Sequence, residues 1–132
     1  PVGALEIDRR GMIVGWNPAA ERIFGWSIAE AKTHRFDFIV PEPIRPEIEA
    51  IVTHLLLRDG GFRNTNQNLT KDGRIIDCEW FNTPLVAPDG TTFGLACLVL
   101  DVTERNRLDA ELRRLNEQLE AMVRERTAAL QM

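Results

Sequence analysis

Cysteine, basic charge and long apolar runs are scarce in this sequence, and each shortage excludes a class of protein. The 132 residues include two cysteines, too few for a disulfide framework, and Cys78 and Cys97 lack the spacing of a zinc site. The formal net charge of −4 is not the clustered basic charge of a nucleic-acid-binding domain. No apolar run reaches the roughly 20 residues of a membrane-spanning helix, and no signal peptide is present. We therefore expect a cytoplasmic domain with no nucleic-acid partner and no membrane segment.

Patterns of catalytic residues are missing as well. The sequence contains no Ser/His/Asp or Cys/His arrangement, no phosphate-binding glycine loop and no cluster of metal ligands. We therefore expect neither a metal site nor an enzyme in the chain itself. His34 lies in a polar stretch and is expected to be a solvated loop residue. His54 lies on a predicted helix, where a surface or half-buried histidine is more common than a haem ligand.

What is present is ordinary globular composition. Hydrophobic residues make up 44% of the chain and charged residues 27%, which suits one domain with a modest core. The sequence begins without methionine and stops inside a helical pattern, so we expect it to be part of a longer protein.

β-prone runs bounded by turn residues predict five strands. Asp72-Gly73 and Asp89-Gly90 lie between alternating runs and favour hairpins. The predicted strands are Ala4–Asp8, Met12–Trp16, Phe62–Thr70, Arg74–Leu85 and Thr91–Asp101. With a helical segment inserted after the second strand and one long helix at the end, this order predicts an α+β fold with an antiparallel sheet.

Start and stop signals predict two short helices in the inserted segment. Asn17 is a suitable cap with Pro18 at the first helical position, and Gly25 ends the helix. Ser27 and Glu30 have the spacing of a capping box that opens the second helix.

A longer helix is predicted from Pro46 to about Arg58, ended by Asp59-Gly60-Gly61. Its apolar residues at helical spacing are Ile48, Ile51, Val52, Leu55 and Leu56.

Alternation along the strands predicts which side chains face the interior. Cys78, Trp80 and Asn82 share the inward face of the fourth strand, and Cys97 and Val99 share that of the fifth, together with Phe93 and Leu95. The opposite face of the fifth strand is also apolar, so we expect a helix, a terminus or a second subunit to cover it.

The third strand carries a row of asparagines at alternate positions. Asparagine is disfavoured in strands, and burying an unpaired amide costs about 2–7 kcal/mol. With a regular pleat the row faces inward and, with Asn82, lines a pocket for a polar ligand. A bulge or an early strand end would instead turn it to solvent, which suits Asn64 better than Asn68. The candidate pocket residues are Asn66, Asn68, Cys78, Trp80, Asn82, Cys97 and Val99.

The last segment has apolar residues at the a/d spacing of a coiled coil. They are Leu108, Leu112, Leu115, Leu119 and Met122, which we call the heptad seam. We expect a sensor domain over 1–102 and a signalling helix over 103–132 that pairs in a parallel homodimer. The alternative is a helix that folds back on its own sheet, against Ala96, Leu98 and Leu100.

Residues 101–105 join the last strand to this helix. Asp101 or Thr103 can cap the helix, because a short side-chain oxygen accepts hydrogen bonds from free first-turn N–H groups. Asp101 and Glu104 also have capping-box spacing. One strand thus carries candidate pocket residues and the start of the helix. We predict that Asp101, Thr103, Glu104 and Arg105 relay a signal from the pocket.

Three stretches, in order and well spaced, resemble a PAS domain. They are Trp16–Ser27, a central hairpin matched at Thr70–Gly73 with Cys78–Leu85, and Asp101–Arg105. The resemblance covers nearly all of the chain and implies a five-stranded antiparallel sheet with short helices over one face, enclosing a small cavity. PAS domains sense ligands, redox state or light, or simply dimerise, and pass the result to an attached enzyme. Leu119–Leu130 resembles linkers that lead into histidine kinase or diguanylate cyclase modules.

Two cofactor classes of that family are disfavoured by individual residues. The motif that carries the reactive cysteine of flavin-binding light sensors matches Arg35–Phe38, where Phe36 stands in place of cysteine. The iron-ligating histidine of haem-binding oxygen sensors aligns with Ile48, and His54 lies about two turns further on. Haem and cysteinyl-flavin are therefore disfavoured, and the ligand, if there is one, is unknown.

The resemblance implies a sensory module of a bacterial-type signalling protein that acts on an effector in the same chain, first of all a histidine kinase. Two alternatives stay open. One is the input domain of a diguanylate cyclase. The other is a dimerisation module without ligand, whose interior is filled by Phe38, Leu55 and Trp80.

Overall fold

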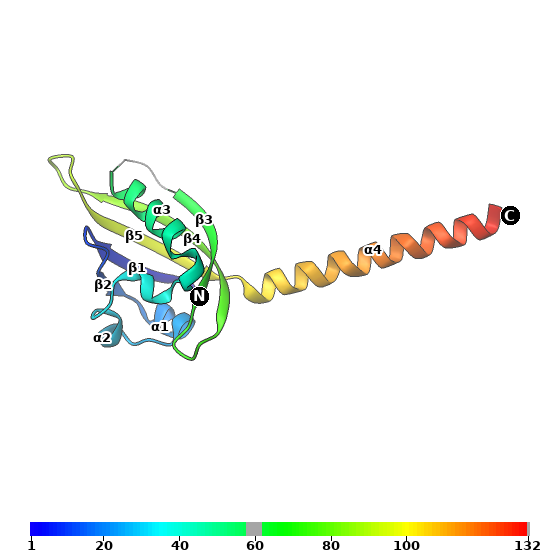
Figure 1. Cartoon of the computed structure of the whole chain (residues 1–132), viewed down its shortest axis with the longest axis horizontal. Coiled ribbons are helices and arrows are strands. Elements are labelled where there is room, and N and C mark those ends of the chain that lie inside the picture. The colour runs from blue at the N-terminus through cyan, green and yellow to red at the C-terminus, as the bar shows by residue number, and fades with distance from the viewer. Residues whose placement is uncertain (58–61, 132) are drawn as a thin grey trace. The chain divides into compact units, whose positions relative to one another are not determined.

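The structure, a computed structural model, describes residues 1–57 and 62–131 (Figure 1). The elements are β1 Gly3–Asp8, β2 Ile13–Trp16, α1 Pro18–Phe24, α2 Ile28–Ala31, the 3₁₀ turns η1 Phe36–Ile39 and η2 Glu42–Ile44, α3 Arg45–Leu57, β3 Phe62–Leu69, β4 Ile75–Val86, β5 Thr92–Asp101 and α4 Thr103–Gln131. Each predicted strand is present, with ends shifted by at most one residue. Arg58 and the turn predicted at Asp59-Gly60-Gly61 lie outside the described residues.

All strand pairs are antiparallel, and the strand order is β2-β1-β5-β4-β3. The first and last strands of the chain therefore pair at the centre of the sheet, with the β1–β2 hairpin on one side and the β3–β4 hairpin on the other. The predicted α+β class with a five-stranded antiparallel sheet is confirmed. The chain divides into two compact units, residues 1–102 and residues 103–132.

The helix signals act as predicted. Asn17 Oδ1 accepts hydrogen bonds from the N–H groups of Ala20 and Ala4, both at 2.9 Å. The cap thereby also ties α1 to β1. Gly25 ends α1 with a φ of 83°, a left-handed conformation that costs glycine little. Ser27 and Glu30 make both hydrogen bonds of the capping box at α2.

The core of the first unit lies between one face of the sheet and the helices α1, α2 and α3 (Figure 1). Phe24 and Leu95 are almost fully buried there, and each such side chain contributes about 1.5–3 kcal/mol by leaving water. The helix α3 turns Ile48 and Leu55 inward, as its apolar spacing predicts.

The fifth strand differs from expectation at Phe93. Phe93 is exposed, although it shares the pleat of Leu95. It lies beside the β4–β5 turn, where the pairing register shifts between Leu85 and Val86. On the opposite face, Leu98 is 50% exposed, and the cover expected for that face stays a prediction.

The helix α4, taken by itself, has 29 residues and is therefore about 43 Å long. Ion pairs between Arg107 and Glu104 and between Arg114 and Glu111 lie on its surface. Its heptad seam is 46% to 64% exposed, so this apolar row is not buried by the helix itself, and both the coiled coil and the helix that folds back on its own sheet stay predictions. Among the described residues, no helix is both long and apolar enough to cross a membrane.

Candidate functional site: a cavity with one amide wall

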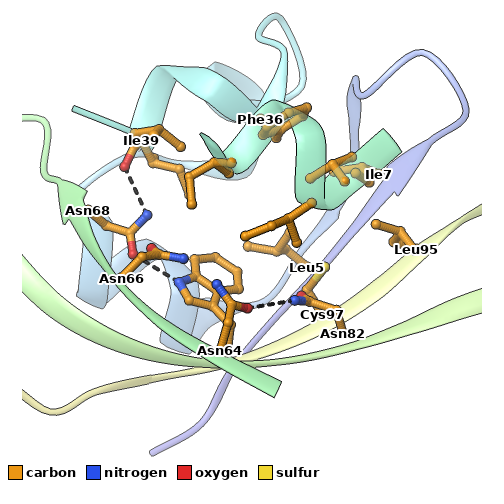
Figure 2. A pocket seen from close by; sticks show the side chains of 15 residues that line it. Leu5, Ile7, Phe36, Ile39, Asn64, Asn66, Asn68, Asn82, Leu95 and Cys97 are labelled. Atoms are coloured by element: carbon orange, nitrogen blue, oxygen red, sulfur yellow. Dashed lines mark hydrogen bonds between the residues drawn. The ribbon is translucent and has the colours of Figure 1, made fainter. Parts of the chain in front are cut away.

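A cavity of about 50 Å³ lies between the inner face of the sheet and the segment from η1 to α3 (Figure 2). The lining residues are Leu5, Ile7, Phe36, Ile39, Val40, Ile48, Ile51, Val52, Asn64, Asn66, Asn68, Trp80, Asn82, Leu95 and Cys97. Carboxamides and the Trp80 indole form one wall, and aliphatic side chains form most of the rest. Within the described ranges, no charged side chain lines the cavity.

The amide wall comes from the regular pleat of β3. Asn64, Asn66 and Asn68 alternate along that strand, and Figure 2 shows them side by side, across the cavity from Leu5 and Ile7. All three line the cavity, so the expectation that Asn64 turns to solvent is wrong. The physical reason is the unbroken pairing of β3 with β4 from Phe62 to Leu69, which keeps every second side chain on the inner face.

Asn68 is the most constrained member of this wall, with 1% of its surface exposed. Its Nδ2 donates to the carbonyl oxygen of Ile39 at 3.0 Å, and its Oδ1 accepts from Nε1 of Trp80 at 2.9 Å. One side chain thus joins β3 to η1 and holds the indole. The Trp80 ring also stacks with Phe24 at 6.1 Å between centroids. Burial of a strand asparagine is tolerated here because both ends of the amide are paired.

The other amides are paired less completely. Nδ2 of Asn82, on β4, donates to Oδ1 of Asn64 at 3.1 Å. Asn66 lies between Asn64 and Asn68 on the strand, and its Oδ1 is buried without a hydrogen-bond partner among the described residues. A buried acceptor of this kind is uncommon in folded proteins and calls for a physical explanation.

The two cysteines face the interior from adjacent strands, as the alternation predicts. The register places Cys97 opposite Asn82 and Cys78 opposite Asp101. The thiols are therefore offset by four residues, or about 13 Å along the strands. A redox pair is excluded at that separation. Burial raises the pKa of each thiol to about 12, so both are protonated at neutral pH.

Five of the seven predicted pocket residues line the cavity: Asn66, Asn68, Trp80, Asn82 and Cys97. Cys78 and Val99 are fully buried but lie outside the lining. Val99 instead lies beside Gly3 and α1. A Cβ atom built on Gly3 would be 2.6 Å from Val99 Cγ1 and 3.5 Å from Cα of Ala20, a residue of α1. The inward face of β5 therefore contacts the cavity through Leu95 and Cys97 but not through Val99.

Sequence reasoning missed the aliphatic part of the wall. Ile39 and Val40 approach from η1 and its end, and Ile48, Ile51 and Val52 approach from α3. Their spacing marks them as inward-facing, but a core residue and a cavity-lining residue carry the same signal.

His34 is not the solvated loop residue that its polar neighbours predict. Its ring is half-buried and stacks on Phe38, with 4.6 Å between centroids and 1° between planes. Trp26 packs against both rings at 5.4 Å. Trp26 precedes α2, His34 follows it and Phe38 lies in η1. Periodicity along the sequence does not predict that these three rings meet.

The lining residues do not fit the two cofactors that the sequence disfavours. Phe36 and Ile48 both contribute to the cavity wall. By the resemblance, Phe36 stands where a cysteine that reacts with flavin would be required, and Ile48 stands where a histidine that ligates haem iron would be required. His54 is exposed on α3 and does not line the cavity. The volume is also far below the 300–1,000 Å³ typical of sites for larger ligands.

The predicted relay residues lie at the end of β5 and directly after it, and β5 is the strand that supplies Leu95 and Cys97 to the cavity. β5 ends at Asp101, and α4 begins at Thr103, with Glu104 and Arg105 in its first turn. The intervening Val102 is 4% exposed, and its N–H donates to the carbonyl oxygen of Asp77 on β4 at 2.8 Å. The end of β5 is therefore fixed to the sheet up to the residue before the helix.

A five-stranded antiparallel sheet whose helices enclose a small cavity is the fold that the PAS resemblance implies. The family model described as PAS fold matches residues 1–102, and the chain belongs to the PAS family. The recognition made from the sequence motifs is thereby confirmed.

A curated relative places this family in a signalling context. The sensor protein FixL of Bradyrhizobium diazoefficiens is 27% identical over 135 residues, which cover 90% of this chain and 24% of FixL. The chain therefore spans about a quarter of the length of that relative.

Solved structures share the fold. The PAS domain of a protein from Colwellia psychrerythraea has a TM-score of 0.74 at 21% identity, covering 78% of this chain and 87% of its own. A sensory box histidine kinase/response regulator from Burkholderia thailandensis E264 has a TM-score of 0.67 at 18% identity, covering 91% of each chain.

Proposed function

We propose that this chain is the sensory module of a bacterial-type signalling protein and passes the state of its cavity through β5 and α4 to an effector. The observation that carries the proposal is the placement of two features on one strand. β5 supplies Leu95 and Cys97 to the cavity and ends two residues before the helix begins. A shift of this strand would move the start of α4, where Asp101 and Thr103 act as relay residues.

The chain acts as a homodimer in this proposal. The heptad seam is an exposed apolar row on a helix of 29 residues, and pairing two such rows removes them from water. A parallel pair brings two effectors together at the same end of the coil, so that a change in the helix reaches both.

The effector is a histidine kinase in the same chain, and the module itself has no catalytic role. This choice is supported by the linker-like segment Leu119–Leu130, and by relatives described as a sensor protein and as a histidine kinase/response regulator. A diguanylate cyclase is the alternative effector for the same linker. Two buried free thiols suit a reducing cytoplasm.

A dimerisation module without ligand is the second candidate. It is favoured by the small volume that Trp80 and the aliphatic wall leave between them, about 50 Å³. Of the residues that were expected to fill the interior in this alternative, Leu55 is buried and Phe38 is half-buried.

The relay is tested in the full-length protein by a double-mutant cycle. Asn66→Leu alters the cavity, and its effect is measured as a change in the activity of the attached catalytic domain. We expect that change to disappear in the Asp101→Ala and Thr103→Ala backgrounds, because the strand end no longer engages the helix. Coupling of this kind is what a cycle isolates.

Asp109→Ala is the matched control, since it removes the same group from an exposed position of α4. In that background Asn66→Leu should change activity as it does in the parent protein. An equal effect of Asn66→Leu in all backgrounds would refute the relay through Asp101 and Thr103.

A further inference from the structure

The unpaired oxygen of Asn66 is the starting point for identifying a ligand. Its neighbours in the row have partners: Asn68 is paired at both ends of its amide, and Asn64 Oδ1 accepts from Asn82. Asn66 Oδ1 is buried and has no partner among the described residues. Since a buried carbonyl oxygen can only accept, a group that satisfies it must present an N–H or O–H donor.

The walls limit what such a group belongs to. The cavity has no charged lining residue in the described part of the chain, and an unpaired charge would not be stable in an apolar site. Leu5, Ile7, Ile48 and Leu95 form an aliphatic surface that suits carbon rather than water. A volume of about 50 Å³ is several times the 10–15 Å³ needed to hold one water, which allows a molecule of only a few heavy atoms.

We infer that the cavity binds a small uncharged molecule that donates a hydrogen bond to Asn66 Oδ1 and packs its carbon atoms on the aliphatic wall. Short alcohols and small primary amides have this chemistry. The inference rests on the proposed sensory function and deepens it by naming the ligand class. Asn66 is the residue that distinguishes a donor from a non-donor, because a non-donor leaves its buried oxygen unpaired.

A pair of probes with equal numbers of heavy atoms tests this preference. 2-Propanol carries a hydroxyl donor, whereas acetone has the same skeleton and can only accept. Each is titrated into the isotope-labelled chain over the millimolar range, and amide chemical shifts are followed by NMR. We expect saturable shifts in the cavity strands and a dissociation constant about tenfold lower for 2-propanol.

Two variants locate the preference. Asn66→Leu replaces the amide by an apolar group of similar size, and the two probes should then bind with equal affinity. Gln67→Leu makes the same kind of change at the adjacent exposed residue of β3 and should leave the tenfold preference intact. Dispersed amide spectra of both variants establish that they are folded.

Two outcomes would overturn the inference. Equal affinity of the unmodified chain for both probes would remove the role of the Asn66 acceptor. Absence of saturable binding by either would mean that the cavity holds water alone. Neither outcome bears on the relay proposed above. The double-mutant cycle with Asp101 and Thr103 measures activity without an added ligand, so its result is independent of the binding of either probe.

Discussion

Replacing Asn68 by leucine removes the hydrogen bonds that hold the amide wall together. Leucine has nearly the same shape but neither donates to the Ile39 carbonyl nor accepts from the Trp80 indole, bonds of 3.0 and 2.9 Å in the parent chain. Ile39 is 2% exposed and Trp80 is 7% exposed, so bulk solvent does not reach the lost partner at either end.

The magnitude follows from two buried groups left unpaired. Each costs about 1–3 kcal/mol, or about 4 kcal/mol for the two at the middle of that range, and the apolar gain from leucine offsets up to roughly 2 kcal/mol of this sum. We therefore expect Asn68→Leu to lower the free energy of unfolding by about 2–4 kcal/mol. For a domain of about 100 residues, that corresponds to a fall in Tm of at least about 8 °C.

The assay is urea unfolding followed by tryptophan fluorescence, at one fixed protein concentration because the proposed dimerisation would also contribute to stability. Gln67→Leu, on the exposed face of the same strand, is the control and should change stability by less than about 0.5 kcal/mol. Combining Asn68→Leu with Trp80→Phe should lower the free energy of unfolding by less than the sum of the two single effects. Both substitutions remove the same hydrogen bond, from Trp80 Nε1 to Asn68 Oδ1. An Asn68→Leu variant as stable as the Gln67→Leu control would refute this account of the amide wall.

Three further predictions concern the surface, the thiols and the helix. The Lys71 ammonium, 2.6 Å away, and the Ser27 N–H lower the pKa of Glu30 from 4.5 to about 2. The stabilisation by ionised Glu30 should therefore be complete above pH 4.5 and lost as the pH falls toward 2. The stability difference between the parent chain and Glu30→Gln, measured by urea unfolding, should shrink over that range, and a constant difference would contradict the assignment. Cys78 and Cys97, whose pKa values are raised to about 12 by burial, should resist thiol reagents at neutral pH in the folded chain and react in urea; rapid labelling of the folded chain would contradict their placement. Leu112→Lys with Leu119→Lys should convert the proposed dimer to a monomer, measured by light scattering, whereas Glu117→Lys, outside the heptad seam, should not; a parent chain that is already monomeric would contradict the pairing of the seam.

Much of the fold follows from local signals in the sequence. Asn17-Pro18, Ser27 with Glu30, and the Asp-Gly turns each set a backbone conformation within a few residues, so their positions are predictable without the tertiary structure. The row of asparagines on β3 is predictable to the extent that a regular pleat is assumed, and the structure supplies that pleat through full pairing with β4.

The rest depends on register and packing, which local patterns do not specify. Cys78 and Cys97 share an inward face, but only the β4–β5 register shows that they are four residues apart. Val99 lies on the α1 side of the core, away from the cavity, where the backbone of Gly3 lies close to its side chain. Whether the aliphatic residues around Ile48 pack tightly or leave a cavity depends on the volumes of side chains from six different elements.

The claim at the centre of this account is that α4 carries the signal from the PAS domain to the effector as one strand of a coiled coil. It is tested most directly by inserting residues after Met122 in the full-length protein and measuring the activity of the catalytic domain. A seven-residue insertion preserves the heptad seam, whereas a two-residue insertion rotates everything beyond it by about 200°. The account predicts normal regulated activity with the longer insertion and lost or inverted regulation with the shorter one. Equal tolerance of both insertions would contradict it.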